Sequence, residues 1–311
     1  MAIVGEKAIA EQGRTDVERA PAADERADTY RIALAQTAPA LGVVDANHND
    51  HLEKIAAARA ARADLVVFPE LSLTGYFLRD MVPDVAMAAD APQLGELASA
   101  AKGAAVVAGF VEESPRHRFY NSACYLENGV IAHVHRKVYL PTYGLFDESR
   151  YFAAGERIEA FDTTRLGRVG LLVCEDFWHL SAAAIMQAEQ VDLLICVANS
   201  PARGVSGDQI DTAATYKRLC RTYAELIGCV VVMVNRVGYE DGLCFWGGSL
   251  VVGPDGEIHG EAPLLDESLT IVEFNAADLR RQRLTTPLGR DEQLLLTIEE
   301  LNRIKRDRYR D

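Results

Sequence analysis

The sequence has 311 residues, of which 49% are hydrophobic and 25% are charged, and its 32 basic and 46 acidic side chains give a net charge of −14. This composition excludes a disordered chain, a collagen and a coiled coil, and the length suffices for a core that needs no disulfide or metal to fold. The acidic balance argues against nucleic acid and anionic membranes as partners, because both are bound by basic surfaces.

Residues 1–29 are rich in charged side chains of both signs. We do not expect a secretory signal here, because such a signal needs an uninterrupted apolar stretch. We predict a mobile acidic leader. No part of the sequence approaches the ~18 consecutive apolar residues of a membrane-spanning helix, so we expect no membrane partner. The six cysteines are scattered, with no paired spacing, which indicates reduced thiols. Together these features favour a cytoplasmic protein.

Strand and helix patterns alternate along the chain from residue 30 onward. The first half predicts strands over 30–36, 64–68 and 104–111, with helices over 47–62 and 92–102 between them. A hairpin of strands 119–127 and 130–138 follows, around the turn signal Asn128-Gly129. The second half predicts strands over 169–173, 192–198 and 229–235, with helices over 181–190 and 208–226. A hairpin turning at 254–256, a strand over 269–274 and a helix over 294–305 complete the chain.

The apolar runs in these strands lack polar alternation, which indicates strands that are buried on both faces under helices. The predicted fold class is therefore α/β. No Pro/Gly/Ser-rich linker interrupts residues 30–275, which we assign to a single domain. Residues 276–311 are predicted to form a C-terminal helical extension.

Common cofactor and metal motifs are missing from the sequence. It contains no phosphate-binding GxxxxGK[ST] loop, no GxGxxG at a helix start and no HExxH. His133 and His135 share one face of a predicted strand, but no third ligand lies nearby in the sequence. We therefore predict no metal and no cofactor.

Three stretches each place a reactive side chain at the end of a buried strand. Glu70 follows a strand in FPELSLTGY, Lys137 leaves a strand in HRKVYLP, and Cys174 ends a strand in LLVCEDFWH. Each alone is weak evidence, since a strand-end carboxylate is commonly a helix cap and a strand-end cysteine is commonly inert. Together they are informative, because ligand sites of open α/β sheets gather at strand ends.

In these three stretches the sequence resembles the carbon–nitrogen hydrolase (nitrilase) superfamily, which is marked by a Glu–Lys–Cys triad. The resemblance implies catalytic roles for Glu70, Lys137 and Cys174 and a supporting role for Glu148. It also implies an αββα sandwich that assembles through a two-fold interface into a homodimer or a larger even-numbered homo-oligomer.

Within the superfamily, KVYLPTYGLFDESRYF and CEDFW are most similar to the glutamine-hydrolysing domain of glutamine-dependent NAD synthetases. By position, the resemblance implies substrate contacts from five side chains: Tyr76, Tyr143, Phe146, Phe177 and Ser200. The SGGxDS loop of the synthetase part does not occur in the sequence, so we expect a free-standing amidase. The stretch Trp246-Gly247-Gly248 also departs from the acidic-Gly pair expected at that position, which implies a different pocket.

The implied reaction is hydrolysis of a small carboxamide, such as a glutamine-like ω-amide, through a thioester on Cys174. Glu70 would act as base, while Lys137 and the backbone N–H of Glu175 would stabilise the oxyanion. The same triad also suits a nitrilase or an N-carbamoyl-amide hydrolase. An acyltransferase that passes the thioester to an amine, or a non-catalytic binding protein on the same fold, are the alternatives from other classes.

Overall fold

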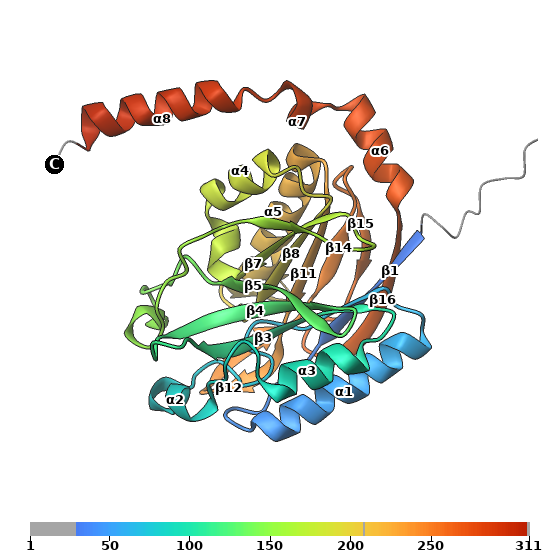
Figure 1. Cartoon of the computed structure of the whole chain (residues 1–311), viewed down its shortest axis with the longest axis vertical. Coiled ribbons are helices and arrows are strands. Elements are labelled where there is room, and N and C mark those ends of the chain that lie inside the picture. The colour runs from blue at the N-terminus through green and yellow to red at the C-terminus, as the bar shows by residue number, and fades with distance from the viewer. Residues whose placement is uncertain (1–28, 208, 310–311) are drawn as a thin grey trace, which may run out of the picture.

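The computed structural model describes residues 29–207 and 209–309. The predicted acidic leader lies outside this range except for its last residue. Most of the described strands belong to two six-stranded sheets that pack face to face, with helices on both outer sides (Figure 1).

The first sheet has the strand order β16-β1-β2-β3-β4-β5. Its strands are β1 (Thr29–Gln36), β2 (Leu65–Val67), β3 (Ala105–Glu113), β4 (Phe119–Glu127), β5 (Val130–Arg136) and β16 (Ser268–Asn275). Strands β1, β2 and β3 are parallel neighbours, whereas β4, β5 and β16 are joined antiparallel. The carboxyl end of β2 and the end of β5 carry the segments that contain Glu70 and Lys137.

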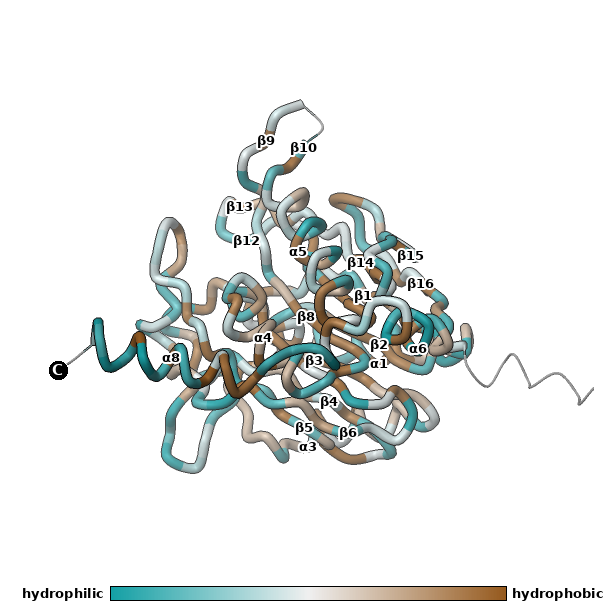
Figure 2. The backbone as a smooth tube through the Cα atoms, turned by 90° about the horizontal axis from the view of Figure 1, so that it is seen from above, coloured by the Kyte–Doolittle hydropathy of each residue, from teal (hydrophilic) through white to brown (hydrophobic). Residues whose placement is uncertain are grey.

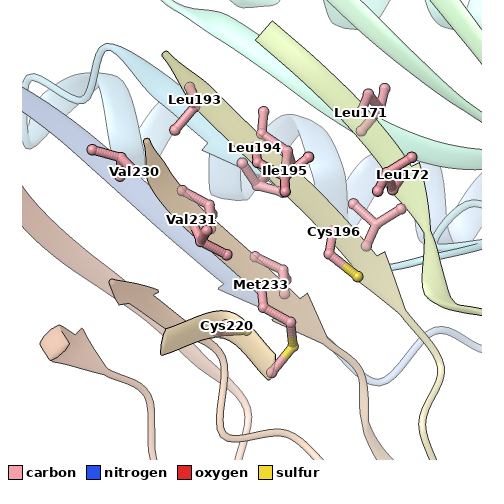
Figure 3. Close-up of a cluster of buried hydrophobic side chains, with 14 of the residues drawn as sticks. Leu171, Leu172, Leu193, Leu194, Ile195, Cys196, Cys220, Val230, Val231 and Met233 are labelled. Carbon is pink, nitrogen blue, oxygen red and sulfur yellow. The ribbon is translucent and has the colours of Figure 1, made fainter. Parts of the chain in front are cut away.

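The second sheet has the strand order β15-β14-β11-β8-β7-β6. Its strands are β6 (Ala160–Asp162), β7 (Arg168–Val173), β8 (Leu193–Ala198), β11 (Val230–Asn235), β14 (Leu250–Val252) and β15 (Ile258–Glu261). The central strands β7, β8 and β11 are parallel and almost wholly apolar, and their side chains form the cluster drawn in Figure 3. Cys174 directly follows the end of β7.

Helices cover the outer face of each sheet. Helices α1 (Val44–Ala60) and α3 (Pro92–Ala100) pack on the first sheet, and α4 (Leu180–Ala188) and α5 (Asp211–Ile227) on the second (Figure 1). Helix α5 presents an apolar side to its sheet, with Tyr216, Cys220 and Tyr223 buried. This arrangement of four layers confirms the predicted α/β fold of the αββα type in a single domain.

Shorter elements surround the sandwich. They are the helices α2 (Val82–Val85), η1 (Arg79–Met81), η2 (Glu148–Arg150) and η3 (Cys174–Trp178), and the small hairpins β9 (Val205–Ser206) with β10 (Gln209–Ile210) and β12 (Val237–Glu240) with β13 (Leu243–Trp246). Both small hairpins lie on the same side of the molecule (Figure 2). Neither hairpin was predicted from the sequence.

After the last strand, three helices run along one side of the domain: α6 (Ala276–Thr285), α7 (Leu288–Asp291) and α8 (Leu294–Arg308) (Figure 1). Helix α8 carries large apolar side chains that are exposed, namely Leu294, Leu295, Leu296, Ile298 and Leu301. None of the helices within 29–207 and 209–309 is both long and apolar enough to cross a bilayer.

Candidate active site

Glu70 lies in a loop that follows β2 and is pressed closely against β3. Leu71, the next residue, has a left-handed backbone with φ of 46°, which is strained for a branched side chain. The loop fits because position 109 is a glycine, where a Cβ atom would come within 2.2 Å of the Leu71 nitrogen. This close approach places the Glu70 side chain, which has no exposed surface, inside the molecule.

Lys137 directly follows β5 and points into the same interior space. Its Nζ donates to Glu70 Oε1 at 2.8 Å and to Glu148 Oε1 at 2.6 Å. The Lys137 and Glu70 side chains have no exposed surface, and that of Glu148 is 5% exposed. Lys137 is therefore held between the carboxylates of Glu70 and Glu148.

Cys174 directly follows β7 and is the first residue of the short helix η3. Its φ is 46°, so the backbone is left-handed at a non-glycine residue, a form of strain that concentrates at functional sites. The Sγ atom lies 3.4 Å from the hydroxyl of Tyr216 on α5. The structure thus brings Glu70, Lys137 and Cys174, from both sheets, to one buried location.

Charge and burial together set the protonation of this cluster. Burial alone would lower the pKa of Lys137, but the carboxylates of Glu148 and Glu70 outweigh it and hold that pKa well above its usual value. Burial raises the pKa of Glu148 to about 7, in spite of the nearby ammonium. Burial and the Glu70 carboxylate raise the pKa of the Cys174 thiol, so the thiol is protonated at neutral pH.

Asn121, which the sequence did not single out, and the backbone of Asn199 complete the environment of Glu70. Asn121 on β4 donates its side-chain Nδ2 to Glu70 Oε1 at 2.7 Å. The backbone N–H of Asn199, just after β8, donates to Glu70 Oε2 at 2.7 Å. Both carboxylate oxygens are therefore fixed by directed bonds, which favours a single orientation of the side chain.

Tyr76, one of the predicted pocket residues, donates its hydroxyl to Glu148 Oε1 at 2.5 Å. Its ring meets the ring of Phe146 edge to face, with centroids 6.3 Å apart. Both side chains, together with Glu148, line a pocket of about 220 Å³. Tyr76 thus contacts the charged cluster directly through a carboxylate.

The other three predicted pocket residues lie in different surroundings. Tyr143 is half exposed, and its hydroxyl donates to both carboxylate oxygens of Glu175, at 2.9 and 3.0 Å. Ser200 is buried, and its Oγ accepts from Nε1 of Trp246 at 3.2 Å. Phe177, within η3, has no exposed surface and its ring contacts those of Tyr216 and Tyr223 on α5, so its side chain lies in the core and the expected substrate contact is wrong.

Arg203 is a further polar side chain in this region that the sequence did not indicate. Its guanidinium lies 4.7 Å from the centroid of the Phe146 ring. Its buried Nη2 has no hydrogen-bond partner among the described residues. Burial and the Glu175 carboxylate raise the pKa of the Tyr143 hydroxyl to about 12, and the positive charge of Arg203 acts against that rise. A buried, unpaired guanidinium donor of this kind is suited to an anionic group of a ligand.

The two histidines of β5 contact other side chains of the protein. His135 is buried and bonds to Asp176, and the ring of His133 stacks on Phe161 with centroids 4.2 Å apart. Within residues 29–207 and 209–309, no group of three or more His, Cys, Asp or Glu side chains is arranged to hold a metal ion.

Comparison with known proteins places the chain in a family. Residues 31–284 match the carbon-nitrogen hydrolase family. The chain is 32% identical over 262 residues to the glutamine-dependent NAD(+) synthetase of Acinetobacter baylyi, and 35% identical over 265 residues to that of Rhodobacter capsulatus. These alignments cover 82% and 81% of this chain and 46% and 45% of the synthetases, so the chain spans about half the length of these relatives.

The fold has close counterparts among solved structures. A carbon-nitrogen hydrolase from Helicobacter pylori G27 matches with a TM-score of 0.77 and 25% identity, over 88% of this chain and 98% of that one. The αββα sandwich, the family match and the sequence relatives all indicate the same family. The chain belongs to the carbon–nitrogen hydrolase family.

Proposed function

We propose that this protein hydrolyses the terminal carboxamide of a small molecule through a thioester on Cys174 and releases ammonia. The observation that carries the proposal is the convergence of Glu70, Lys137 and Cys174 in one buried cluster, with the lysine bonded to two carboxylates. The membership in a family of carbon–nitrogen hydrolases supports the reaction class.

In the first half of the proposed reaction, Glu70 takes the proton of the Cys174 thiol while Sγ attacks the amide carbon. The negative charge that develops on the carbonyl oxygen is stabilised by the Lys137 ammonium and by the backbone N–H of Glu175. Glu70 then gives its proton to the amide nitrogen, the C–N bond breaks and ammonia leaves. The acyl group stays on Cys174 as a thioester.

In the second half, a water molecule enters and Glu70 takes one of its protons. The resulting hydroxide attacks the thioester, and the tetrahedral intermediate is stabilised by the same donors. When the C–S bond breaks, the proton on Glu70 returns to the sulfur. The enzyme is restored, and a carboxylic acid is released. Glu148 holds Lys137 in place throughout through its hydrogen bond to Nζ.

We further propose that the substrate carries a carboxylate, as a glutamine-like ω-amide does. The support is the buried, unpaired Nη2 of Arg203 beside Phe146 and the influence of that charge on Tyr143. A hydrogen bond between charged groups contributes about 1.5–3 kcal/mol, so Arg203→Gln should raise KM for glutamine by about tenfold to hundredfold. For an amide without a carboxylate, such as propionamide, the same variant should leave KM within about threefold.

The test is ammonia release from a panel of ω-amides, simple amides, nitriles and N-carbamoyl compounds. We expect release from ω-amides, abolished in Cys174→Ala and retained in Cys244→Ala, which removes a partly exposed thiol outside the cluster. No release from any compound, or full release by Cys174→Ala, would refute the amidase proposal. Release from nitriles or N-carbamoyl compounds alone would replace it with the corresponding hydrolase.

We also propose that the protein is a homo-oligomer, in which the exposed apolar side chains of α8 become covered. Light scattering coupled to size-exclusion chromatography tests this, and a single monomer peak at micromolar concentration would contradict it. We propose a cytoplasmic location as well, which the six free cysteines support.

A further inference from the structure

Asp176 is a completely buried carboxylate that accepts four hydrogen bonds. Its Oδ1 accepts from the backbone N–H of Val138 at 3.0 Å and of Tyr139 at 2.9 Å. Its Oδ2 accepts from the backbone N–H of Val173 at 3.1 Å and from Nε2 of His135 at 2.8 Å. Because an ionised carboxylate only accepts, His135 carries its proton on Nε2.

These four donors flank two members of the proposed triad. Val173 directly precedes Cys174, whereas His135 and Val138 lie on either side of Lys137. The strand that leads to Lys137 belongs to the first sheet, and the strand that leads to Cys174 belongs to the second. One carboxylate therefore connects the backbone beside the lysine to the backbone beside the thiol, across the boundary between the sheets.

The connection is directional, whereas most contacts between the two sheets are not. The sheets face each other through apolar side chains, whose attraction depends on buried area and specifies no hydrogen-bond geometry. A second contact joins the segment after Lys137 to the segment after Cys174. The ring of Tyr139 stacks on that of His179, with centroids 3.6 Å apart. Its hydroxyl also lies 2.6 Å from Oγ of Ser181, at the start of α4.

The bonds to Asp176 are strong enough to keep it ionised. Burial alone would raise its pKa, but the hydrogen bond and charge of His135 and the backbone donors Tyr139 and Val173 outweigh burial and lower the pKa. A carboxylate held in this way remains charged at neutral pH, and its bonds are charge-assisted.

We propose that Asp176 is a positioning residue, which fixes the Lys137 segment of one sheet relative to the Cys174 turn of the other. Its relevance to turnover rests on the proposed function. Asp176 touches neither the substrate nor the reacting atoms in this account. It acts by keeping the base, the ammonium and the thiol at the separations that the chemistry needs.

The test uses Asp176→Asn, which keeps the size of the side chain but places an amide N–H₂ against the donors. A misplacement of about 1 Å can cost about 10²-fold in rate, so we expect kcat to fall by about that factor with KM within about threefold. The matched control is Glu127→Gln, another buried carboxylate, which accepts from the backbone N–H and hydroxyl of Thr164. We expect the control to retain wild-type kcat.

A second readout needs no substrate, so it separates this proposal from the proposed function. An ordinary thiol is about 1% ionised at pH 6.5, so rapid alkylation there requires a positioned base. We expect iodoacetamide to alkylate Cys174 about tenfold more slowly in Asp176→Asn than in the control at pH 6.5, and at a similar rate at pH 9. Equal rates at pH 6.5 would overturn the proposal, even if no amide is hydrolysed by the wild type.

If Asp176→Asn does not fold, two variants at His135 decide the question. His135→Leu removes one of the four donors, whereas His135→Gln retains a side-chain N–H that can reach Oδ2. We expect the leucine variant to lose alkylation rate at pH 6.5 and the glutamine variant to regain most of that loss. Identical rates in the two variants would overturn the proposal.

Discussion

Tyr76→Phe removes one oxygen atom from a nearly buried side chain and leaves the ring in place. The lost hydroxyl donates to Glu148 Oε1, the same oxygen that accepts from Lys137 Nζ. Burial raises the pKa of Glu148 to about 7, and the hydrogen bond from Tyr76 is one of the interactions that keep it from rising further. Its removal should therefore raise that pKa.

The size of this shift follows from the energy of the bond. A hydrogen bond to a charged group contributes about 1.5–3 kcal/mol, and Lys137 recovers part of it by turning toward the vacated lone pair. A remaining loss of about 1.4 kcal/mol corresponds to one pKa unit, so the pKa of Glu148 should move from about 7 to about 8. The carboxylate fraction at pH 7 then falls from about one half to about one tenth.

The assay is kcat/KM for the best amide substrate between pH 5.5 and 9.5. The ionised form of Glu148 holds Lys137, so kcat/KM should fall on acidification through pH 7 in the wild type. In Tyr76→Phe the same fall should begin about one pH unit higher, with most activity recovered at pH 9.5. Tyr125→Phe, which removes a buried tyrosine hydroxyl elsewhere, serves as control. An unshifted acidic limb in Tyr76→Phe would refute this reasoning.

Two further variants and one comparison variant, Gly95→Ala, test the support of the site. Glu240→Gln removes the charge of the carboxylate that accepts from Nη1 of buried Arg236 at 2.6 Å. We expect the free energy of unfolding in urea to fall by about 3 kcal/mol. A loss below about 1 kcal/mol would contradict a structural role for this ion pair. Gly109→Ala places a Cβ atom 2.2 Å from the Leu71 nitrogen and should destabilise the protein and abolish activity, whereas Gly95→Ala, with open space around it, should stabilise it by about 0.5–1 kcal/mol. A folded and fully active Gly109→Ala protein would show that the Glu70 loop tolerates displacement.

The fold could be predicted from the sequence because its central strands are unusually uniform. The apolar runs at 192–198 and 229–235 contain no polar alternation, and the structure places both as buried parallel neighbours in the second sheet. Long periodic helices such as α5 were also recognisable. The hairpin β12–β13 was missed although Asp241-Gly242 is a strong turn signal, because its strands are only four residues long.

The site could be predicted only in part, since its members lie far apart in the sequence. Glu70, Lys137 and Cys174 each follow the end of a buried apolar strand, which is a local signal. Asn121 and Arg203 have no such signal, because what distinguishes them is a contact or an unpaired atom that forms only in the folded chain.

Individual roles within a recognised motif also depended on tertiary packing. In the stretch CEDFW, nothing in the sequence indicated the role of Asp176, which bonds across the two sheets. Phe177 was expected to contact substrate, and its ring is enclosed by the core beneath α5. Spacing in the sequence could not distinguish these environments, because adjacent residues of a tight turn point in different directions.

The most direct test of the central claim is detection of the covalent intermediate. Wild-type protein is mixed with its best amide substrate, quenched with acid within milliseconds to seconds, and digested for peptide mass mapping. We predict an acyl group on the peptide that contains Cys174, and we predict that it disappears once the substrate is exhausted. Turnover without any adduct on Cys174, or with an adduct on Cys244 in its place, would contradict the proposed mechanism.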